Sequence, residues 1–301
     1  MAGDELRDLL DRHARPDPTT AIEGVRICRF GPGAAPMSSM SGTVLAVVAQ
    51  GGKRLALGDR FYDYGVGQYL VASVDVPVTG HVVDASVSRP TLGFGLSLEP
   101  ADIAELLMQA GPGDLPRASG IPRPGIAVST APTELRDAIV RMLRLLDRPQ
   151  DRRVMAPLIK REILWLLMTG EQGDSVRQIG LEDSSLGQVT RSVRWIRANY
   201  TEPFRVEELA RRSAMSVAAF HRNFQVVTGM SPIQFQKYIR LQTARLLLAN
   251  HPNDITGVGH RVGYSSASQF SREYRRLFGA APSHDAVLIR GQTGRPPVAL
   301  P

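Results

Sequence analysis

Residues 206–282 carry one short pattern twice, and this repeat limits what the chain can fold into. A short amphipathic stretch over 206–213 is followed by three residues that suit a tight turn, and then by a second stretch with an apolar stripe from Val217. Two short helices joined by a tight turn are typical of a helix-turn-helix. The arrangement returns further on, so the sequence predicts two modules in tandem, module one over 206–224 and module two over 255–278.

A longer helix is predicted between the modules, from Pro232 to Ala249. Ser231 can cap it by accepting a bond from a free backbone N–H, and Pro232 suits its first position, where a missing N–H costs nothing. At about 1.5 Å per residue this helix spans roughly 27 Å, and one turn of B-DNA is about 34 Å. A connector of that length can place the second helices of both modules in successive major grooves on one face of a duplex.

The outward faces of these second helices are the candidates for reading DNA. Their inward stripes are aromatic, and such stripes are usually core. The outward residues are Val217, Ala218, His221 and Arg222 in module one, and Ala267, Ser268, Ser271 and Arg272 in module two. Arg222 and Arg272 occupy matching positions, and an arginine there can fork onto guanine O6 and N7. We expect His221 and Ser268 to flank them as readers.

Positive charge is concentrated on this part of the chain. Residues 184–290 hold 15 lysines and arginines against 6 aspartates and glutamates, whereas residues 1–183 hold 20 against 23. A surface that faces phosphates needs such an excess, while a merely solvated helical bundle more often mixes its signs. The candidates for phosphate contact are Arg191, Arg194, Arg211, Arg212, Arg240, Arg275 and Arg276. The pattern therefore favours binding to double-stranded DNA over a plain helical bundle.

The two modules differ in glycine content. The first helix of module one has no glycine, whereas that of module two holds Gly257 and Gly259. Each interior glycine costs about 0.8–1 kcal/mol relative to alanine. We therefore expect module two to be the weaker one and Gly257 to lie nearer the surface. Alanine at both positions is expected to stabilise this helix and to tighten DNA binding.

Residues 24–98 have the pattern of short strands. Runs rich in β-branched residues alternate with glycine and proline, and Gly51-Gly52 and Gly58-Asp59 are predicted as hairpin turns. Many short strands at close spacing suggest a sandwich or a small barrel. Three helices are predicted to follow, over 101–110, 134–146 and 151–167, with a loop rich in proline and glycine over 111–125.

The first twenty residues leave two alternatives open. They are polar apart from Leu6, Leu9 and Leu10. The spacing of these leucines predicts a short helical arm, and a loosely held terminus is the alternative.

A metal or catalytic site has little support in the strand-rich segment. The chain has six histidines, and only His81 lies there. One imidazole cannot build a histidine-rich transition-metal site, and no Ser/His/Asp or Cys/His set falls in the segment. We therefore predict no catalytic residues, no bound metal and no cofactor, with His81 as an ordinary strand residue.

A barrel interior can instead enclose a small organic molecule. The candidate pocket residues are Tyr62, Tyr64 and Tyr69, although tyrosines also serve as packing residues. A filled barrel with a purely structural role is the alternative.

Cysteine usage and hydropathy predict a cytoplasmic protein without a membrane anchor. The single cysteine, Cys28, excludes an internal disulfide and suits a reducing compartment. No apolar run reaches transmembrane length, and the N-terminus lacks a secretory apolar region. Cys28 itself is predicted as a buried small hydrophobe, with a reactive sensor thiol as the alternative.

Two sets of motifs carry a family resemblance. The first set is Leu209-Ala, Ser216, Phe224, Gly229-x-Ser-Pro232, Arg240-Leu, Ala244, Val262-Gly-Tyr264, Ser268-x-Phe-Ser-Arg272 and Phe278-Gly-x-x-Pro282. It resembles the DNA-binding domain of AraC-family transcription regulators. The second set is Gln50-Gly-Gly-Lys53, Leu57-Gly-Asp59, Tyr62-x-Tyr64, Gly67-Gln-Tyr-Leu70 and Ser73-Val-Asp-Val-Pro77. It resembles the cupin-like N-terminal domain attached to one subgroup of these regulators.

The resemblance implies an α+β chain with two domains. These are a cupin-like β-barrel with trailing helices over 15–170 and an all-α tandem helix-turn-helix domain over 184–290. It further implies a non-enzymatic regulator that binds promoter DNA as a homodimer, responds to a small organic effector and contacts RNA polymerase. Two alternatives remain: a metal-independent cupin-type enzyme fused to a DNA-binding domain, and an architectural DNA binder without a ligand.

Overall fold

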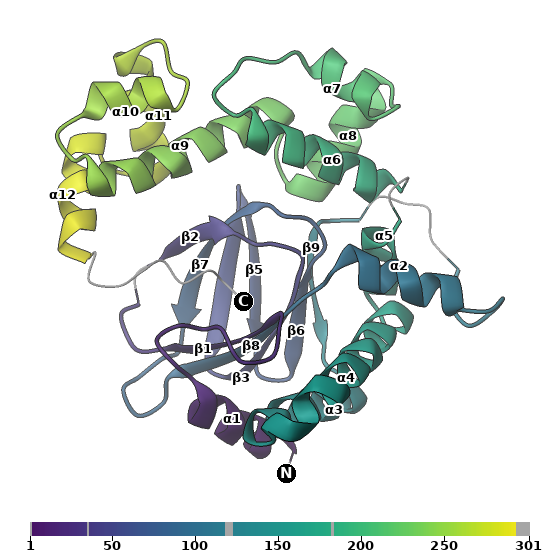
Figure 1. Cartoon of the computed structure of the whole chain (residues 1–301). Coiled ribbons are helices and arrows are strands. Elements are labelled where there is room, and N and C mark those ends of the chain that lie inside the picture. Colours follow the sequence, from purple (N-terminus) through teal and green to yellow (C-terminus); the bar gives the residue numbers. More distant parts are fainter. Residues whose placement is uncertain (1, 35, 118–122, 182–183, 293–301) are drawn as a thin grey trace. The chain divides into compact units, whose positions relative to one another are not determined.

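The computed structural model describes residues 2–34, 36–117, 123–181 and 184–292, and the side chains of 4–34, 36–117, 123–181 and 184–287 (Figure 1). The chain divides into two compact units. Within the described residues, the N-terminal unit extends to Thr190 and includes Val226–Gly229, and the C-terminal unit holds Arg191–Gln225 and residues 230–292.

The N-terminal unit is built on two antiparallel sheets. The larger has the strand order β1-β8-β3-β6-β9 and the smaller has the order β2-β7-β4-β5. The strands are β1 Val25–Phe30, β2 Met37–Met40, β3 Val44–Gln50, β4 Gly52–Leu57, β5 Arg60–Gly65, β6 Gln68–Ala72, β7 Pro77–Val83, β8 Thr91–Ser97 and β9 Ile126–Thr130. The predicted strand-rich fold class is confirmed, although β9 lies beyond the segment 24–98 that was predicted to form strands.

One of the two predicted hairpins is correct. Leu57 pairs with Arg60 across the two-residue turn Gly58-Asp59, which joins β4 to β5. The prediction at Gly51 was wrong, because β3 pairs with β6 and β8 whereas β4 pairs with β5 and β7. The chain therefore crosses from one sheet to the other at Gly51, where φ is +75° and a Cβ would lie 2.4 Å from the Thr91 hydroxyl oxygen.

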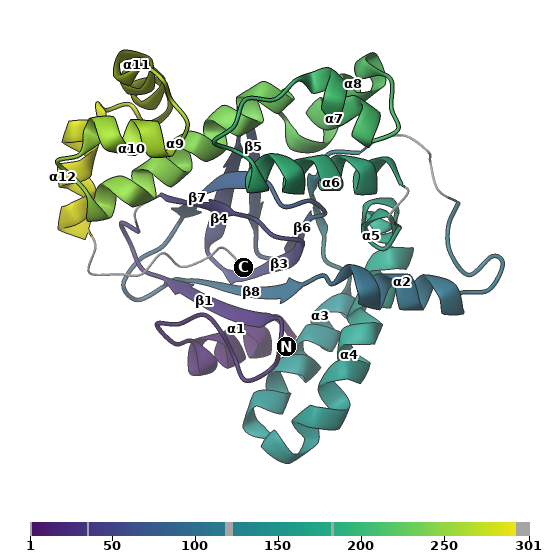
Figure 2. The same cartoon turned by 45° about the horizontal axis from the view of Figure 1, so that its top comes forward.

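Helices cover one face of the larger sheet, and their apolar side chains share one core with it (Figure 2). The helices of this unit are α1 Ala2–His13, α2 Pro100–Gln109, α3 Thr133–Arg144, the 3-10 helix η1 Leu145–Asp147, α4 Pro149–Thr169 and α5 Gly173–Ile179. Helix α3 begins at Thr133, one residue before the predicted start, and no side chain caps it.

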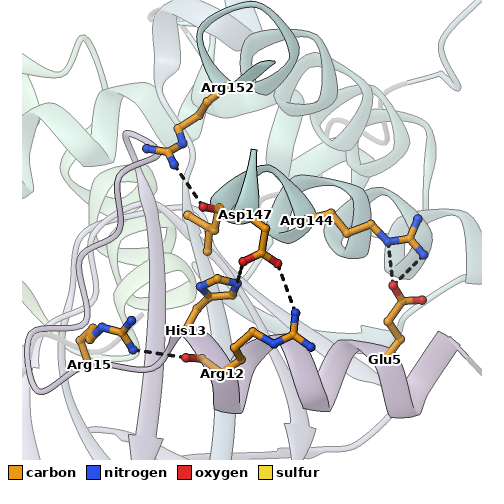
Figure 3. Close-up of polar contacts among 8 residues, drawn as sticks. Glu5, Arg12, His13, Arg15, Arg144, Asp147 and Arg152 are labelled. Atoms are coloured by element: carbon orange, nitrogen blue, oxygen red, sulfur yellow. Dashed lines mark hydrogen bonds and ion pairs between the residues drawn. The ribbon is translucent and has the colours of Figure 1, made fainter. Parts of the chain in front are cut away.

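The N-terminal arm is a docked helix, which decides between the two alternatives for residues 1–20. Leu6, Leu9 and Leu10 of α1 are all buried in the core shared with α3 and α4. Polar contacts surround this apolar face: Glu5 pairs with Arg144 at 2.6 Å, and Asp147 pairs with Arg12 at 3.3 Å and His13 at 3.2 Å (Figure 3). Most of these groups are solvent-exposed, and exposed ion pairs contribute little, so the leucines supply most of the docking energy.

The C-terminal unit is all-helical. Its helices, with α6 beginning just before the unit, are α6 Ser185–Ala198, α7 Val206–Arg212, α8 Val217–Thr228, α9 Pro232–Asn250, α10 Ile255–Arg261, α11 Ala267–Phe278 and α12 Pro282–Gln292. The two predicted modules and the connector are confirmed as α7–α8, α10–α11 and α9. None of the helices in the described residues is both long and apolar enough to cross a membrane.

Candidate nucleic-acid interface

Module one is a compact helix pair. In the turn between α7 and α8, Ala214 adopts a φ of +52° and the N–H of Met215 donates to the carbonyl of Ala210 at 3.0 Å. Ala210 is 1% exposed, as the close crossing of two helices requires. The hydroxyl of Ser216 accepts from the N–H of Ala219 at 3.3 Å and so caps α8.

Module two repeats this geometry with a turn that is one residue longer, 262–266 in place of 213–216. The left-handed position is Gly263, with φ +88°, and a Cβ there would lie 2.3 Å from the carbonyl oxygen of Thr201. The hydroxyl of Ser266 caps α11 by accepting from Gln269 at 3.3 Å. Glycine at 263 is therefore required by both backbone conformation and space.

The first helix of module two has a side-chain cap that the sequence analysis missed. The carboxylate of Asp254 accepts from the N–H of Gly257 at 2.9 Å, whereas no side chain caps α7. A Cβ on Gly257 would lie 2.3 Å from this carboxylate, and a Cβ on Gly259 would lie 3.1 Å from the ring of Phe270. A methyl group at either position meets a neighbouring side chain, and these contacts oppose the gain in helix propensity on which the predicted stabilisation of α10 rests.

The eight predicted base-reading positions are all accessible to solvent. Seven are exposed and Ser271 is half-buried. On the opposite faces of α8 and α11, Phe220, Phe224, Phe270 and Tyr274 are fully buried. The structure thus presents two outward faces of mixed polarity, each on a helix whose first turn is capped by a serine.

Six of the seven predicted phosphate-contacting arginines are exposed. They are Arg191, Arg194, Arg211, Arg212, Arg275 and Arg276. Arg212 also pairs with Glu208 at 2.6 Å and lies 5.1 Å from the ring centre of Trp195. Their exposure leaves these six side chains as candidates for phosphate contact.

The seventh arginine, Arg240 on α9, has another role, and the expectation of a phosphate contact is corrected. Its Nε donates to the carbonyl of Tyr200 at 2.6 Å, Nη2 to Thr201 at 2.9 Å and Nη1 to Gly263 at 2.9 Å. Burial lowers the pKa of this guanidinium. Arg240 therefore joins the loop before module one to the turn of module two, because a planar fork of donors can satisfy three carbonyls at once.

Two further polar groups tie α9 to module two and to α12. The carboxylate of Glu273 accepts from Lys237 at 2.7 Å and from the Tyr264 hydroxyl at 2.8 Å. Asp285 accepts from the Tyr274 hydroxyl at 2.7 Å and pairs with Arg245 at 2.9 Å. Burial raises the pKa of the Tyr274 phenol, and its bond to the carboxylate raises it further, so this hydroxyl stays a proton donor.

The three candidate pocket tyrosines do not come together. Tyr64 is 5% exposed on β5 in the smaller sheet. Tyr69 is 2% exposed and packs in the core between the larger sheet and the helices, and Tyr62 is half-buried. A common pocket is thus excluded for these side chains, since Tyr64 and Tyr69 belong to different layers.

Acidic, histidine and cysteine side chains do not cluster in the N-terminal unit as a metal site would need. Across the residues whose side chains are described, no group of three or more such residues could hold a metal ion. His81 is a half-buried residue of β7, in register with Arg54, which confirms its prediction as a strand residue.

Comparisons with known proteins agree with this architecture. A family model described as the AraC-type transcriptional regulator N-terminus matches residues 21–175, and a helix-turn-helix domain model matches residues 209–285. VirF of Yersinia enterocolitica, a virulence regulon transcriptional activator, is 27% identical over 185 residues, which are 60% of this chain and 66% of that protein. The transcriptional activator RhaS of Pectobacterium carotovorum is 31% identical over 36% of this chain and 40% of its own length.

Solved structures share the fold across both units. Apo ToxT from Vibrio cholerae aligns with a TM-score of 0.53 at 10% identity, over 90% of this chain and all of that one. ToxT with an unsaturated fatty acid bound aligns with a TM-score of 0.52 at 11% identity, over 89% and 95%. The N-terminal family model alone spans just over half of the chain, and the chain therefore belongs to the AraC-type family of DNA-binding transcriptional regulators, a family that is not enzymatic.

Proposed function

We propose that this protein recognises specific operator sequences in promoter DNA, with α8 and α11 in successive major grooves. The observation that carries the proposal is the pair of serine-capped helices whose accessible faces hold Arg222 and Arg272 at matching positions. Helix α9 has 19 residues, which corresponds to roughly 28 Å. That length is close to the ~34 Å between successive major grooves.

In this proposal the accessible residues divide into two roles. Arg222 and Arg272 read guanines, each worth roughly 1–3 kcal/mol of discrimination, with His221 and Ser268 beside them. The remaining accessible positions of α8 and α11 contribute close packing against the bases. The six exposed arginines contact phosphates and position the domain without reading sequence.

Selection of bound sequences from a random DNA pool tests these roles. Arg222→Ala and Arg272→Ala should each relax the preference at a different subsite, about one helical turn apart. Arg153→Ala, which removes an exposed charge from α4 of the N-terminal unit, is the matched control and should leave the preference unchanged. If either variant weakens binding to all sequences equally, that arginine contacts phosphate and does not read bases.

The N-terminal domain, with boundaries near residues 15 and 170, is proposed to bind a small organic effector and to assemble the homodimer. A structure of ToxT holds an unsaturated fatty acid. We infer from it only that a fold of this kind can accommodate an effector. The exposed side chains of Val154, Met155 and Leu158 on α4 form an apolar patch suited to self-association. The DNA-binding domain, near residues 184–290, then acts on transcription by RNA polymerase in the cytoplasm.

Two measurements test this half of the proposal. A ligand that binds only the folded protein raises its melting temperature, with about 2.7 kcal/mol of stabilisation at a concentration 100 times Kd. A metabolite panel that produces no shift would favour the architectural DNA binder without a ligand. Sedimentation velocity of the full chain reports the oligomeric state directly, and a monomer at all concentrations would exclude the homodimer.

A further inference from the structure

A lysine lies inside the N-terminal unit, between its two sheets. Lys53 on β4 is 5% exposed and alternates with the exposed Arg54, so its side chain faces inward with Leu55. Its Nζ lies 4.6 Å from the ring centre of Phe30 and 3.6 Å from the position that a Cβ on Gly93 would occupy. Both of these residues belong to the larger sheet, so Lys53 spans the space between the sheets.

This lysine has no anionic partner. Lys53 makes neither a hydrogen bond nor an ion pair with any of the residues that the structure describes. Beside it, Thr91 is 0% exposed, and its hydroxyl oxygen is without a hydrogen bond within the described part of the chain. Lysine is almost never fully buried unless it is paired, and a buried polar group without a partner is costly. The interior therefore holds a hydroxyl whose bonding capacity is unused and, against Phe30, an amine without an anionic partner.

The titratable neighbours of Lys53 are neutral. Burial raises the pKa of the Cys28 thiol on β1, which Lys53 and Arg26 only partly offset, and burial also raises the pKa of the Tyr64 phenol on β5. Burial lowers the pKa of the Lys53 amine, while Cys28 acts weakly in the opposite direction. Asp63 on the neighbouring strand β5 is exposed and pairs with Arg54 at 2.6 Å, so neither Cys28 nor Tyr64 beside Lys53 supplies a negative charge at neutral pH. The raised pKa also removes Cys28 as a reactive thiolate.

A pocket of about 300 Å³ opens on the same inner face of the larger sheet. Arg26 and Gly95 line it, and they pair across β1 and β8 one register step from Cys28 and Gly93. A step of two residues is about 7 Å along a strand. Arg26 therefore lines this pocket, whereas Lys53, packed against Gly93, lies about one step further along the same face and is not among the lining residues.

The rim of this pocket also carries acidic groups. Asp75 and Glu99 line it, and the carboxylate of Asp75 accepts from the backbone N–H of Gly42 at 2.8 Å. Arg26 offsets this negative charge at the opening, whereas nothing offsets the positive charge of a protonated Lys53 further in. The arrangement attracts a negative group to the interior and not to the rim.

We infer that the space between the sheets binds a small organic carboxylate whose carboxylate group pairs with Lys53. This inference rests on the proposed effector-binding role of the N-terminal domain and names the chemical class of the effector. The ligand supplies the missing counter-ion, and charge-assisted bonds from an amine to a carboxylate are among the stronger ones. Thr91 lies opposite Phe30 across β1 and β8 and offers a hydroxyl as a second donor.

Binding by such a site is coupled to proton uptake. Burial lowers the pKa of the Lys53 amine, and only the protonated amine pairs with a carboxylate. The affinity for carboxylates should therefore fall as the pH rises.

Isothermal titration of the full chain tests the inference. The probes are acetate, butanoate, hexanoate and benzoate, each compared with its primary amide. At least one carboxylate should bind with a submillimolar Kd, and its amide should bind at least tenfold more weakly. Lys53→Met should lower the carboxylate affinity at least tenfold without lowering the melting temperature, because methionine fills similar space without a charge. Lys160→Met is the control, since Lys160 pairs with Asp102 on the helical layer at 2.8 Å, and it should bind as the unmodified protein does.

Three results would overturn the inference: no carboxylate binds, an amide binds as tightly as its acid, or Lys53→Met keeps the affinity. Should Lys53→Met fail to fold, Lys53→Gln gives the same comparison with a neutral polar side chain.

The measurements also distinguish failure of the carboxylate inference from failure of the proposed effector role. If neutral metabolites bind and carboxylates do not, only the chemical class is wrong. If no metabolite of any class raises the melting temperature while DNA is still bound, the effector role itself is wrong.

Discussion

Replacing Arg240 tests how the two modules are held in one DNA-binding domain. Its guanidinium donates to the carbonyls of Tyr200, Thr201 and Gly263 at 2.6–2.9 Å. A net hydrogen bond contributes about 0.5–1.5 kcal/mol, and bonds from charged donors contribute more. These carbonyls belong to half-buried residues, so water replaces part of what is lost. We expect Arg240→Met to lower the free energy of unfolding by about 3 kcal/mol.

The chain offers a clean fluorescence assay for this loss. It has two tryptophans, Trp165 in α4 and Trp195 in α6. In a Trp165→Phe background Trp195 is the remaining tryptophan. The centre of its ring lies 5.8 Å from the centre of the Phe204 ring, so its fluorescence reports on the C-terminal unit alone. With a urea m-value of about 1–3 kcal/mol per M for a small domain, the midpoint should fall by roughly 1–2 M.

Two control variants separate a structural clamp from a phosphate contact. Arg240→Lys keeps the charge, but a single ammonium cannot span three carbonyls, so most of the loss should remain. Arg194→Met removes an exposed arginine of α6 and should change stability by less than about 0.5 kcal/mol. The reasoning is refuted if Arg240→Met leaves the urea midpoint unchanged and instead flattens the salt dependence of DNA binding by about 0.9 in log–log slope.

Three further predictions concern salt, module two and pH. Six phosphate contacts give a log–log slope of DNA affinity against salt of about −5, and a mobility-shift titration with a slope flatter than about −2 would contradict a footprint over two grooves. Gly257→Ala gains about 0.8–1 kcal/mol of helix propensity but disturbs the Asp254 cap, which contributes about the same, so amide exchange across α10 should not slow. Gly259→Ala presses on Phe270 and should speed that exchange, and slower exchange in either variant would refute the packing argument. Since burial lowers the pKa of Lys53 below its ordinary value of 10.5, the unfolded state binds more protons. Lys53→Met should therefore raise the free energy of unfolding most at low pH, and the gain should shrink as the pH rises toward 10.5. A gain that does not vary with pH would contradict the assignment.

Local signals in the sequence were enough to predict the helices of the DNA-binding domain. Ser231 caps α9 as expected and forms a full capping box with Gln234, and Ser216 caps α8. Caps, apolar stripes and glycine turns act over three or four residues, so they can be recognised without the fold. The segregation of positive charge is likewise a sum over residues and needs no structure. These features, with the family motifs, determined the fold class and the DNA-binding role.

The tertiary structure decided what each individual side chain does. Arg240 looked like another basic residue until the fold brought in the carbonyls of Tyr200 and Gly263, which lie 40 and 23 positions away in the chain. Gly51 marks a turn in the sequence, but strand pairing makes it a crossing between sheets. Lys53 is unremarkable in a motif of mixed polarity and becomes a buried cation only because Phe30 and Gly93 close over it. In each case the deciding contacts are long-range, and the electrostatic and steric environment that they create is not encoded in any short segment.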